Sequence, residues 1–384
     1  MQRKPTMHDV ARAAGVGTMT VSRVLNQSPH VAAETAERVH RAVSKLGYHP
    51  NEMARALRSF KSRTIGVIVP NLDDTFYSTC AHAINLVARE HGYSVLITTS
   101  DDNADTEYEQ AQQMMQRHVE GLAVIPTGNG RSRLGAPAFR SIPIVALDRP
   151  VKDAKIDSLV VENEGGAHAA VEHLIDAHQH RRILFLGYKR DLYTVQLRAA
   201  GYARAMKGAG LAPQRNFHCS SNEAALSVLR DALAGPEPPT AIFCANNLVT
   251  LHALWAVRKL RIQVPSRLAV VSFDDIDLGD TLDPALTVVR QPVAELGRAA
   301  ALLLFERMGE RNGVRNGVPS GDPKIKARPR PSQEVHAVLG LEVILRRSCG
   351  CPHDHAREAT PIAVPAAPQA PKKQKKNGKR VAPS

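Results

Sequence analysis

Features that define several large classes of proteins are scarce in this chain of 384 residues. No apolar run approaches the ~20 residues that span a bilayer, and the N-terminus carries no apolar core of a signal peptide. The cysteines are odd in number and lack the spacing of a disulfide framework: Cys80, Cys219, Cys244, Cys349 and Cys351. We therefore expect a cytoplasmic protein with reduced thiols and no membrane partner.

The signatures of common enzymes are also missing. The sequence contains no nucleophile elbow, no HExxH pair and no P-loop. Residues 127–135 are rich in glycine, but Arg133 stands where a dinucleotide-binding loop needs its third glycine, so we interpret this stretch as a surface loop. Asp274 and Asp275 form a carboxylate pair with no evident acid–base partner or metal ligand. We expect no enzymatic activity and no cofactor.

The net charge of +13 is concentrated at the two ends of the chain. Residues 1–63 contain 11 Lys and Arg against 4 Asp and Glu, and residues 352–384 contain 7 against 2. The 288 residues between them are close to neutral. This distribution favours a polyanionic partner for the ends and a small-molecule or protein partner for the body.

Three short helical patterns occupy the basic N-terminal segment. Thr6 and Asp9 have the spacing of a capping box, a turn at 15–17 contains two glycines, and helices are predicted at Thr18–Leu25 and Ala33–Leu46. The residues expected in the core are Val10, Ala11, Ala14, Val21, Val24, Leu25, Val39, Ala42, Val43 and Leu46. Helix, turn and helix form the helix-turn-helix pattern, whose second helix enters the DNA major groove. An ordinary three-helix bundle is the alternative, and the basic charge favours DNA binding.

Several runs resemble the lactose-repressor family of bacterial regulators in order and spacing. They are MHDVA at 7–11, AGV at 14–16, TVSRVLN at 20–26 and LGYHPN at 46–51. The resemblance extends to about Arg347 and implies a homodimer that places two recognition helices on a near-palindromic double-stranded operator. Thr18, Met19 and Arg23 are the best candidates for base contacts, and Arg23 can pair bidentately with guanine. The full set of expected DNA contacts is Thr6, Thr18, Met19, Thr20, Ser22, Arg23, Asn26, His30, Tyr48, Asn51, Ala54 and Leu57.

The segment at 50–58 is too short to hold a helix alone in water. The resemblance implies that it is a hinge helix, which orders when two copies pair over the minor groove and insert Leu57 between base steps. A plain interdomain linker is the alternative. The expected DNA-binding domain is thus 1–49, followed by a hinge and linker at 50–63.

From Thr64 the pattern changes to apolar strands that alternate with helices. Strands are predicted at 65–70, 95–98, 122–126, 144–147, 182–186, 241–244 and 268–273, and helices at 76–91, 105–117, 196–209 and 249–259. This alternation predicts an α/β region of doubly wound parallel sheets in two halves. The resemblance implies subdomains of periplasmic-binding-protein type, with the chain crossing between them near 162–167, 289–292 and Val335. The expected limits are about 64–162 and 292–334 for one subdomain, and 163–291 and 335–348 for the other.

Ligands of open α/β sheets bind beyond the carboxyl ends of the strands, so the residues that follow each strand are candidates for a binding site. Planar polar groups match the adjacent hydroxyls of a sugar, and aromatic faces cover its apolar face. The candidates are Asn71, Phe76, Tyr77, Asp148, Arg149, Tyr193, Arg198, Asn246, Phe273, Asp274 and Gln291. Each has a structural explanation as well, because such loops are polar and Asp often caps the next helix. As a set they resemble the effector site of the family and of ribose-type sugar-binding proteins.

The end of the chain departs from the family pattern. Residues 309–332 form an insertion rich in Gly, Pro and Arg, and 339–346 resemble the last strand of the family. The run CGCPHDH at 349–355 contains metal-ligand residue types, but it is short and adjoins a tail with six prolines, so we expect no metal site. The tail at 349–384 is expected to be disordered and basic. It has no leucine heptad, which favours a dimer.

The sequence therefore predicts a DNA-binding repressor of a carbohydrate operon, released from or recruited to its operator by a small sugar-like effector. Ribose-like aldoses are the first candidates. A regulator that responds to a purine or another non-sugar metabolite is the alternative. A sugar-binding protein without a DNA role is more remote, because it would be exported and would not need a helix-turn-helix.

Overall fold

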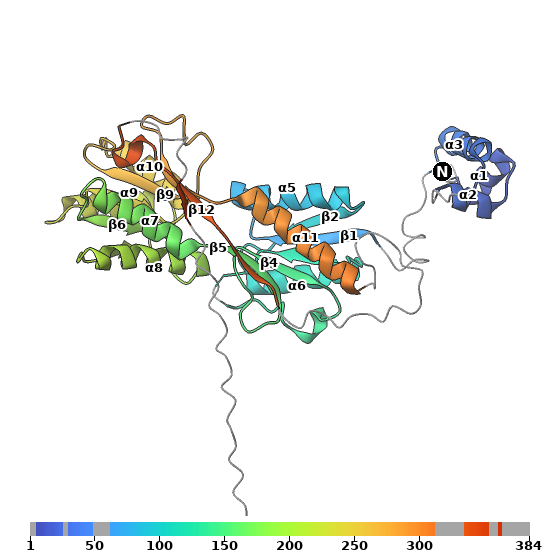
Figure 1. The fold of residues 1–384 in the computed structure, drawn as a ribbon, viewed down its shortest axis with the longest axis horizontal. Coiled ribbons are helices and arrows are strands. Elements are labelled where there is room, and N and C mark those ends of the chain that lie inside the picture. The colour runs from blue at the N-terminus through green and yellow to red at the C-terminus, as the bar shows by residue number, and fades with distance from the viewer. Residues whose placement is uncertain are drawn as a thin grey trace, which may run out of the picture. The chain divides into compact units, whose positions relative to one another are not determined.

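The computed structural model of the chain describes residues 5–25, 30–48, 62–128, 130–311, 334–352 and 360–362. The chain divides into two compact units, Met1–Arg63 and Thr64–Ser384, at the boundary where the sequence predicts the start of the α/β region (Figure 1). None of the helices in the described ranges is long and apolar enough to cross a membrane. Residues 50–61 of the predicted hinge, 312–332 of the insertion and most of the tail lie outside the described residues.

The described residues of the first unit form three helices, and the bounds of the second and third match the prediction. They are α1 (Met7–Ala14), α2 (Thr18–Leu25) and α3 (Ala33–Leu46). The predicted core residues that are fully buried are Val10, Ala11, Ala14, Val21, Val24, Val39 and Ala42. Leu25, Val43 and Leu46 pack against this core but remain partly exposed, because each helix of so small a unit buries only one face.

The caps of these helices follow from single residues. The Thr6 hydroxyl accepts a hydrogen bond from the Asp9 N–H, and the Asp9 carboxylate accepts one from the Thr6 N–H at 2.9 Å, which confirms the capping box. Gly15 and Gly47 end α1 and α3 with φ of 65° and 58°, a left-handed conformation that favours glycine. The helices therefore begin and end where the local sequence specifies.

The α/β unit consists of two lobes, each built on one sheet covered by helices (Figure 1). The sheet of the first lobe is parallel throughout, with the order β11-β5-β4-β3-β1-β2. Its strands are β1 (Thr64–Val69), β2 (Ser94–Thr99), β3 (Leu122–Val124), β4 (Ile144–Leu147), β5 (Asp157–Val161) and β11 (His336–Leu339). Its helices are α5 (Thr75–Glu90), α6 (Ala104–Gln116) and α11 (Val293–Arg311), with a 3-10 turn η1 (Pro137–Phe139). Helices α5 and α11 cover one face of the sheet, and α6 covers the other.

The second lobe has the sheet order β13-β12-β10-β9-β8-β6-β7. Its strands are β6 (Ile183–Leu186), β7 (Gln214–Asn216), β8 (Ala241–Cys244), β9 (Ala269–Phe273), β10 (Thr287–Arg290), β12 (Leu341–Ile344) and β13 (Thr360–Ile362). Its helices are α7 (Asn163–Asp176), α8 (Tyr193–Gly208), α9 (Asn222–Ala234) and α10 (Asn247–Lys259), with a 3-10 turn η2 (Arg347–Cys349). Helices α7 and α8 cover one face, and α9 and α10 cover the other.

The second sheet is parallel from β10 to β7, as predicted, and antiparallel at its other edge. Strand β12 is antiparallel to both β10 and β13. It enters directly from β11 of the first lobe, without a crossover helix, and therefore runs opposite to its neighbours.

The chain crosses between the lobes three times. The first crossing lies at Glu162, between β5 and α7, and the second at 291–292, between β10 and α11, as predicted. The third was expected near Val335 and lies instead at Gly340. The reason is that β11 pairs in parallel with β5, which keeps the chain in the first lobe as far as Leu339.

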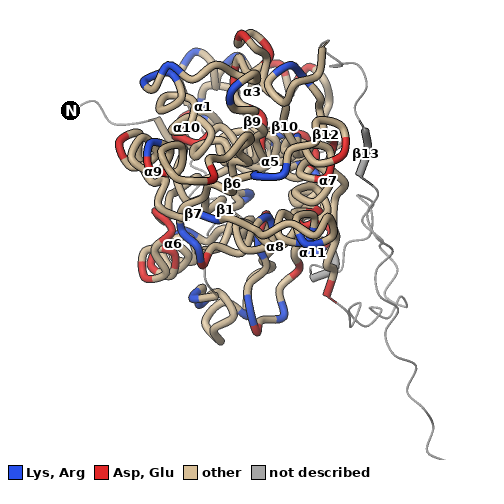
Figure 2. Tube along the Cα trace, turned by 90° about the vertical axis from the view of Figure 1, so that its left-hand side faces the viewer, with Lys and Arg blue, Asp and Glu red and all other residues tan. Residues whose placement is uncertain are grey.

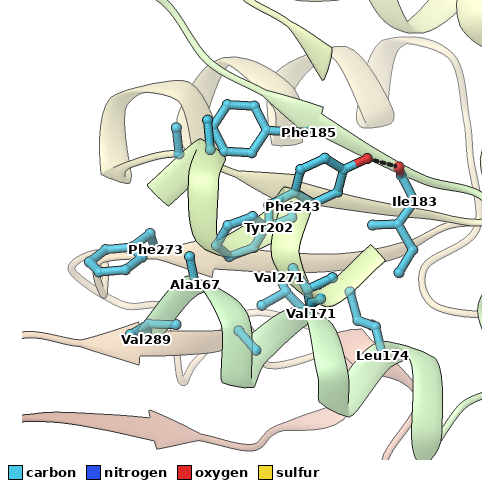
Figure 3. Packing of buried hydrophobic residues seen from close by; sticks show 14 of the residues in the cluster. Ala167, Val171, Leu174, Ile183, Phe185, Tyr202, Phe243, Val271, Phe273 and Val289 are labelled. Atoms are coloured by element: carbon cyan, nitrogen blue, oxygen red, sulfur yellow. Dashed lines mark hydrogen bonds between the residues drawn. The ribbon is translucent and has the colours of Figure 1, made fainter. Parts of the chain in front are cut away.

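A cluster of buried side chains joins α7 and α8 to the second sheet (Figure 3). Phe185, Phe243 and Phe273 come from strands β6, β8 and β9, which are neighbours in the sheet. Tyr202 of α8 is fully buried among them, and its hydroxyl donates a hydrogen bond to the Ile183 carbonyl at 2.7 Å. The polar tip of this ring is thus satisfied while its body fills the core.

Helices α7 and α8 come closest at Gly201. A Cβ atom at this position would lie 2.1 Å from the Glu164 carbonyl oxygen and 3.0 Å from Ala167 Cβ. Both contacts belong to α7, and a backbone oxygen in a helix cannot rotate away. The absence of a side chain at Gly201 therefore sets the separation of the two helices.

We predict that Gly201→Ala lowers the free energy of unfolding by about 1–3 kcal/mol, because the added methyl group must push α7 and α8 apart. Gly208→Ala in the same helix is the matched control. Nothing lies within 4 Å of a Cβ at Gly208, so its better helix propensity should stabilise the chain by about 0.4–1 kcal/mol. Denaturant unfolding followed by circular dichroism compares the two, and equal midpoints would contradict the tight packing.

Candidate DNA-binding and effector sites

The outward face of α2 carries the side chains that the sequence predicts to read DNA. Val21 and Val24 anchor the helix in the core of the first unit. Met19 is 69% exposed and Arg23 is also exposed. The half-buried members of the predicted set on this helix are Thr18, Thr20 and Ser22. A short helix with an exposed guanidinium group and an exposed apolar side chain has the equipment to contact base edges in a major groove.

Tyr48, another of the expected DNA contacts, is mostly buried. It is only 8% exposed and packs in the hydrophobic core of the first unit. Its N–H donates to the Val43 carbonyl at 3.0 Å beyond the left-handed Gly47, as in a Schellman motif, which turns an apolar side chain back onto the helix. The ring therefore stabilises the end of α3.

The other expected DNA contacts on the first unit differ in their surroundings. The Thr6 hydroxyl donates to Asp9 Oδ2 at 2.6 Å within the capping box, so it is already engaged, whereas His30 is exposed. Four expected contacts lie outside the described residues: Asn26, Asn51, Ala54 and Leu57.

Charges of both signs are interspersed along the α/β unit (Figure 2). Among the predicted effector residues, the charged groups are buried and paired. Asp148, Arg149, Arg198 and Asp274 are each less than 9% exposed. Because a buried charge is costly unless it is paired, these pairs constrain the structure around them.

In the first lobe, the predicted residues meet around Arg149, which is 1% exposed. Its Nε donates to Asp148 Oδ2 at 3.1 Å, its Nη2 to the Tyr77 hydroxyl at 2.9 Å, and its Nη1 to Asp102 Oδ1 at 2.9 Å. These residues follow strands β4 and β2 or lie in the first turn of α5, so they share the carboxyl edge of one sheet. The guanidinium group thus holds three separate segments together.

In the second lobe, Arg198 of α8 is the buried arginine at the centre of the predicted residues, as Arg149 is in the first lobe. Its Nε donates to Asn163 Oδ1 at 2.8 Å, and its Nη1 donates to the Ala245 carbonyl at 2.8 Å and to Asp274 Oδ2 at 3.2 Å. The carbon of its guanidinium group lies 3.7 Å from the centre of the Phe273 ring, which is a cation–π contact. The other oxygen of Asp274 accepts a hydrogen bond from Gln291 Nε2.

The two lobes build these pairs in the same way. Asp148 directly follows β4 and Asp274 directly follows β9, and both have left-handed backbones with φ of 63° and 73°. Asp tolerates this conformation better than most residues, and strained conformations cluster at binding sites. Each turn aims a carboxylate at a buried arginine.

Burial and charge shift the pKa values of these carboxyls in opposite directions. Burial raises the pKa of Asp274 above its usual value, although Arg198 and Gln291 oppose that rise. Burial also acts to raise the pKa of Asp102, but Arg149 and Lys189 outweigh it and hold this pKa below the usual value. Burial raises the pKa of Tyr77, so its hydroxyl remains protonated.

Contacts between the lobes add residues that the sequence did not identify. Lys189 of the second lobe donates to Asp102 Oδ2 of the first at 2.6 Å. Asn247 Nδ2, in the first turn of α10, donates to Asp74 Oδ1 at 2.8 Å. Asp102 and Asp74 lie in the loops that follow β2 and β1, so the rule that examines residues after each strand could have found them. Lys189 and Asn247 each lie three residues beyond the end of a strand, β6 and β8 respectively, so the same rule could have found them.

Gly128 also lies where the lobes meet, which corrects its assignment to a surface loop. It is buried, and a Cβ there would lie 2.3 Å from Leu192 Cδ1 of the second lobe and 3.5 Å from Arg149 Nη1. The Leu192 side chain of the second lobe therefore packs directly on this glycine, and a larger residue here would have to displace it.

Some predicted effector residues have structural partners in this arrangement. Asn246 Oδ1 caps α10 by accepting from the Val249 N–H at 2.9 Å, and Asn71 Oδ1 accepts from the Asp74 N–H at 3.0 Å. Phe76 is buried in the core of the first lobe. Tyr193, which is half-buried at the start of α8, has a pKa raised by burial and by the nearby Asp148 and Glu162 carboxylates.

One buried acceptor in this site has no donor. Within the described part of the chain, Gln291 Oε1 makes no hydrogen bond, although its amide nitrogen donates to Asp274. An unsatisfied buried oxygen costs free energy that a hydroxyl or amino group of a ligand would recover.

Comparisons with known proteins agree with this architecture. Residues 6–51 match the family described as bacterial regulatory proteins, lacI family, and residues 171–349 match a periplasmic binding protein-like domain. The chain is 30% identical over 310 residues to the HTH-type transcriptional repressor PurR of Photobacterium profundum, covering 79% of this chain and 92% of that protein. It is 31% identical over 307 residues to the ribose operon repressor of Escherichia coli, covering 79% and 93%.

A solved structure shares the fold over most of the chain. The Lac repressor dimer bound to operator and the anti-inducer ONPF is 25% identical to this chain, with a TM-score of 0.76. The alignment covers 90% of this chain and 99% of that one. The resemblance seen in the short motifs of the first unit therefore extends through both lobes. The chain belongs to the lacI family of bacterial regulatory proteins.

Proposed function

We propose that this chain is a cytoplasmic repressor that binds its operator as a homodimer and responds to a small sugar-like effector held between the lobes. The observation that carries the proposal is the pair of buried arginine–aspartate clusters at the carboxyl edges of the two sheets. Support also comes from the relatives, since one represses a ribose operon and another is a dimer bound to operator and an anti-inducer. We assign no catalytic step to the site.

The polar groups favour a polyhydroxyl ligand over a purine. Asp148, Arg149, Arg198 and Asp274 are planar groups that can each hold two neighbouring hydroxyls, and Gln291 Oε1 offers a free acceptor. The Phe273 ring favours neither ligand, because Arg198 already covers one of its faces at 3.7 Å. The purine-responsive regulator remains the second candidate function.

The contacts between lobes supply a route from effector to DNA. Asp102 and Lys189 form an ion pair across the lobes, and Asp102 also binds Arg149. An effector that binds Arg149 competes for the same carboxylate and thereby changes how the lobes meet. Coupling of this kind is typically worth about 1–3 kcal/mol, enough for about a 5- to 150-fold change in operator affinity.

The DNA-reading role of α2 predicts a loss of specificity in Arg23→Ala. A bidentate arginine–guanine pair discriminates by about 1–3 kcal/mol, so the preference for operator over random DNA should fall about 5- to 150-fold. The operator is first selected from a random-sequence pool with the wild-type chain, and both affinities are then measured at one salt concentration.

Arg38→Ala is the matched control for Arg23→Ala. Arg38 is an exposed arginine of α3, so its loss removes the same charge without touching α2. It should weaken operator and random DNA to a similar extent and keep their ratio. An unchanged ratio in Arg23→Ala would contradict the assignment of α2 as the recognition helix.

The effector site predicts that Asp274→Asn weakens effector binding by more than about tenfold, because the neutral amide no longer pairs with Arg198 or accepts two hydroxyls as a carboxylate does. The effector is found by thermal shift against pentoses, hexoses, sugar acids, sugar phosphates and purines, since a ligand of the folded state raises Tm. Titration calorimetry then compares the variant with the wild-type chain.

Asp283→Asn is the control for this substitution, because Asp283 is 88% exposed and pairs only with Arg347 among the described residues. It should bind the effector as the wild-type chain does. A thermal shift with purines and with no sugar would contradict the sugar-like effector while leaving the DNA-binding role intact.

A further inference from the structure

Four side chains from distant parts of the sequence bring their ligand atoms together in the second lobe. They are His173, His178, Cys349 and Cys351, and the four atoms all lie within 4.8 Å of one another. We propose that this cluster is a structural zinc site, in which two thiolates and two imidazoles bind one ion in a closed tetrahedral arrangement.

Four of the six distances between the ligand atoms are those of a tetrahedral zinc site, and the other two are at most 4.8 Å. The Cys349 and Cys351 sulfurs are 3.5 Å apart, and His173 Nε2 lies 3.5 Å from the first and 3.6 Å from the second. His178 Nε2 lies 3.4 Å from the Cys351 sulfur. With zinc–sulfur bonds of about 2.3 Å and zinc–nitrogen bonds of about 2.0–2.1 Å, tetrahedral ligand atoms are about 3.4–3.8 Å apart. All four measured separations fall in that range.

The backbone around the cluster is shaped for this convergence. Gly350 separates the two cysteines with φ of 111°, a left-handed value that lets both sulfurs reach one point. A Cβ at Gly350 would lie 3.0 Å from His178 Nδ1, so the close approach of the imidazole also depends on glycine. His173 lies in the last turn of α7, and its ring is nearly perpendicular to that of His178, with centres 4.9 Å apart.

The chemistry of the four groups selects the metal. Sulfur and imidazole ligands in a tetrahedral set favour zinc and disfavour calcium and magnesium, which prefer oxygen. Four protein ligands leave no open position, which is typical of a structural and not a catalytic site. Thr287 Oγ1 lies 3.2 Å from the Cys349 sulfur and can donate to a thiolate there, as partners outside the ligand set do in metal sites.

A zinc ion here would join the segment that follows the third crossing to the helix that follows the first. Cys349 ends η2, which follows β12 and the crossing at Gly340, while α7 begins directly after the crossing at Glu162. The first residue of α7, Asn163, holds Arg198 of the effector site at 2.8 Å. The ion would therefore anchor the far end of the helix that positions this arginine, outside the effector site itself.

The sequence alone predicted no metal site because only half of this ligand set is adjacent in the chain. The run at 349–355 also contains His353, Asp354 and His355, which are closer in sequence to the cysteines than His173 and His178 are. The fold brings the two histidines of the α7 region to the cysteines instead.

The test measures zinc in the full chain, purified under reducing conditions without chelators and dialysed. We expect about one zinc per chain and its loss in Cys349→Ser/Cys351→Ser, because thiolates are the strongest ligands of the set. Removal of zinc by a chelator should lower the Tm of the wild-type chain, and added zinc should restore it. His178→Asn keeps both cysteines and should weaken zinc binding by more than about tenfold, which tests the site even if the double cysteine variant does not fold.

Cobalt(II) gives a second readout, because a tetrahedral cobalt–thiolate site absorbs visible light through d–d and charge-transfer bands. The wild-type chain should show these bands, and Cys349→Ser/Cys351→Ser should not. The matched controls are Cys219→Ala, a buried thiol outside the cluster, and His353→Asn/His355→Asn. Both should keep the metal.

Three results would overturn the proposal. One is a fully reduced wild-type chain that takes up neither zinc nor cobalt. Another is zinc that remains in the double cysteine variant, which would mean that it binds elsewhere. The third is loss of metal in His353→Asn/His355→Asn, which would assign the imidazole ligands to the tail and not to the α7 region.

Discussion

The burial of two guanidinium groups is the constraint on which the α/β unit depends. Arg149 and Arg198 are almost fully inaccessible, and a charge in that setting is tolerated only with paired carboxylates and satisfied donors. Asp148 and Asp274 provide those carboxylates from strained turns after β4 and β9. The strand ends of both lobes are therefore held in fixed positions before any ligand arrives, which is the preorganisation that a small-molecule site requires.

The same constraint bears on the proposed response to an effector. Asp102 is shared between Arg149 of its own lobe and Lys189 of the other, so the interior of the site and the contact between lobes depend on one carboxylate. Lys189 is 47% exposed and Asp102 is 15% exposed, so solvent screens this pair more than it screens the pairs that Arg149 and Arg198 form. In the proposed function, this contact between the lobes is the one that the effector changes.

The crossings are the covalent connections between the two lobes. All three crossings are short, and the last consists of Gly340 alone between two strands of different sheets. The cluster of His173, His178, Cys349 and Cys351 joins the segment beyond this crossing to α7. Helix α7 in turn packs closely against α8 at Gly201. Contacts far from the proposed effector site thus hold α7 in place within the second lobe.

Local spacing determined much of this protein from the sequence alone. The capping box of Thr6 and Asp9, the turn around Gly15 and the alternation of apolar strands with helices depend on residues close in the chain, and the structure confirms each of them. The arginines and carboxylates near the strand ends could also be selected from the sequence, because ligands of parallel sheets bind beyond the carboxyl ends of the strands. Tertiary structure alone decided which groups meet: Asp102 with Lys189, Tyr48 with the core, and His173 with Cys349. Such contacts join residues far apart in the chain or depend on how elements pack, and periodicity carries no information about either.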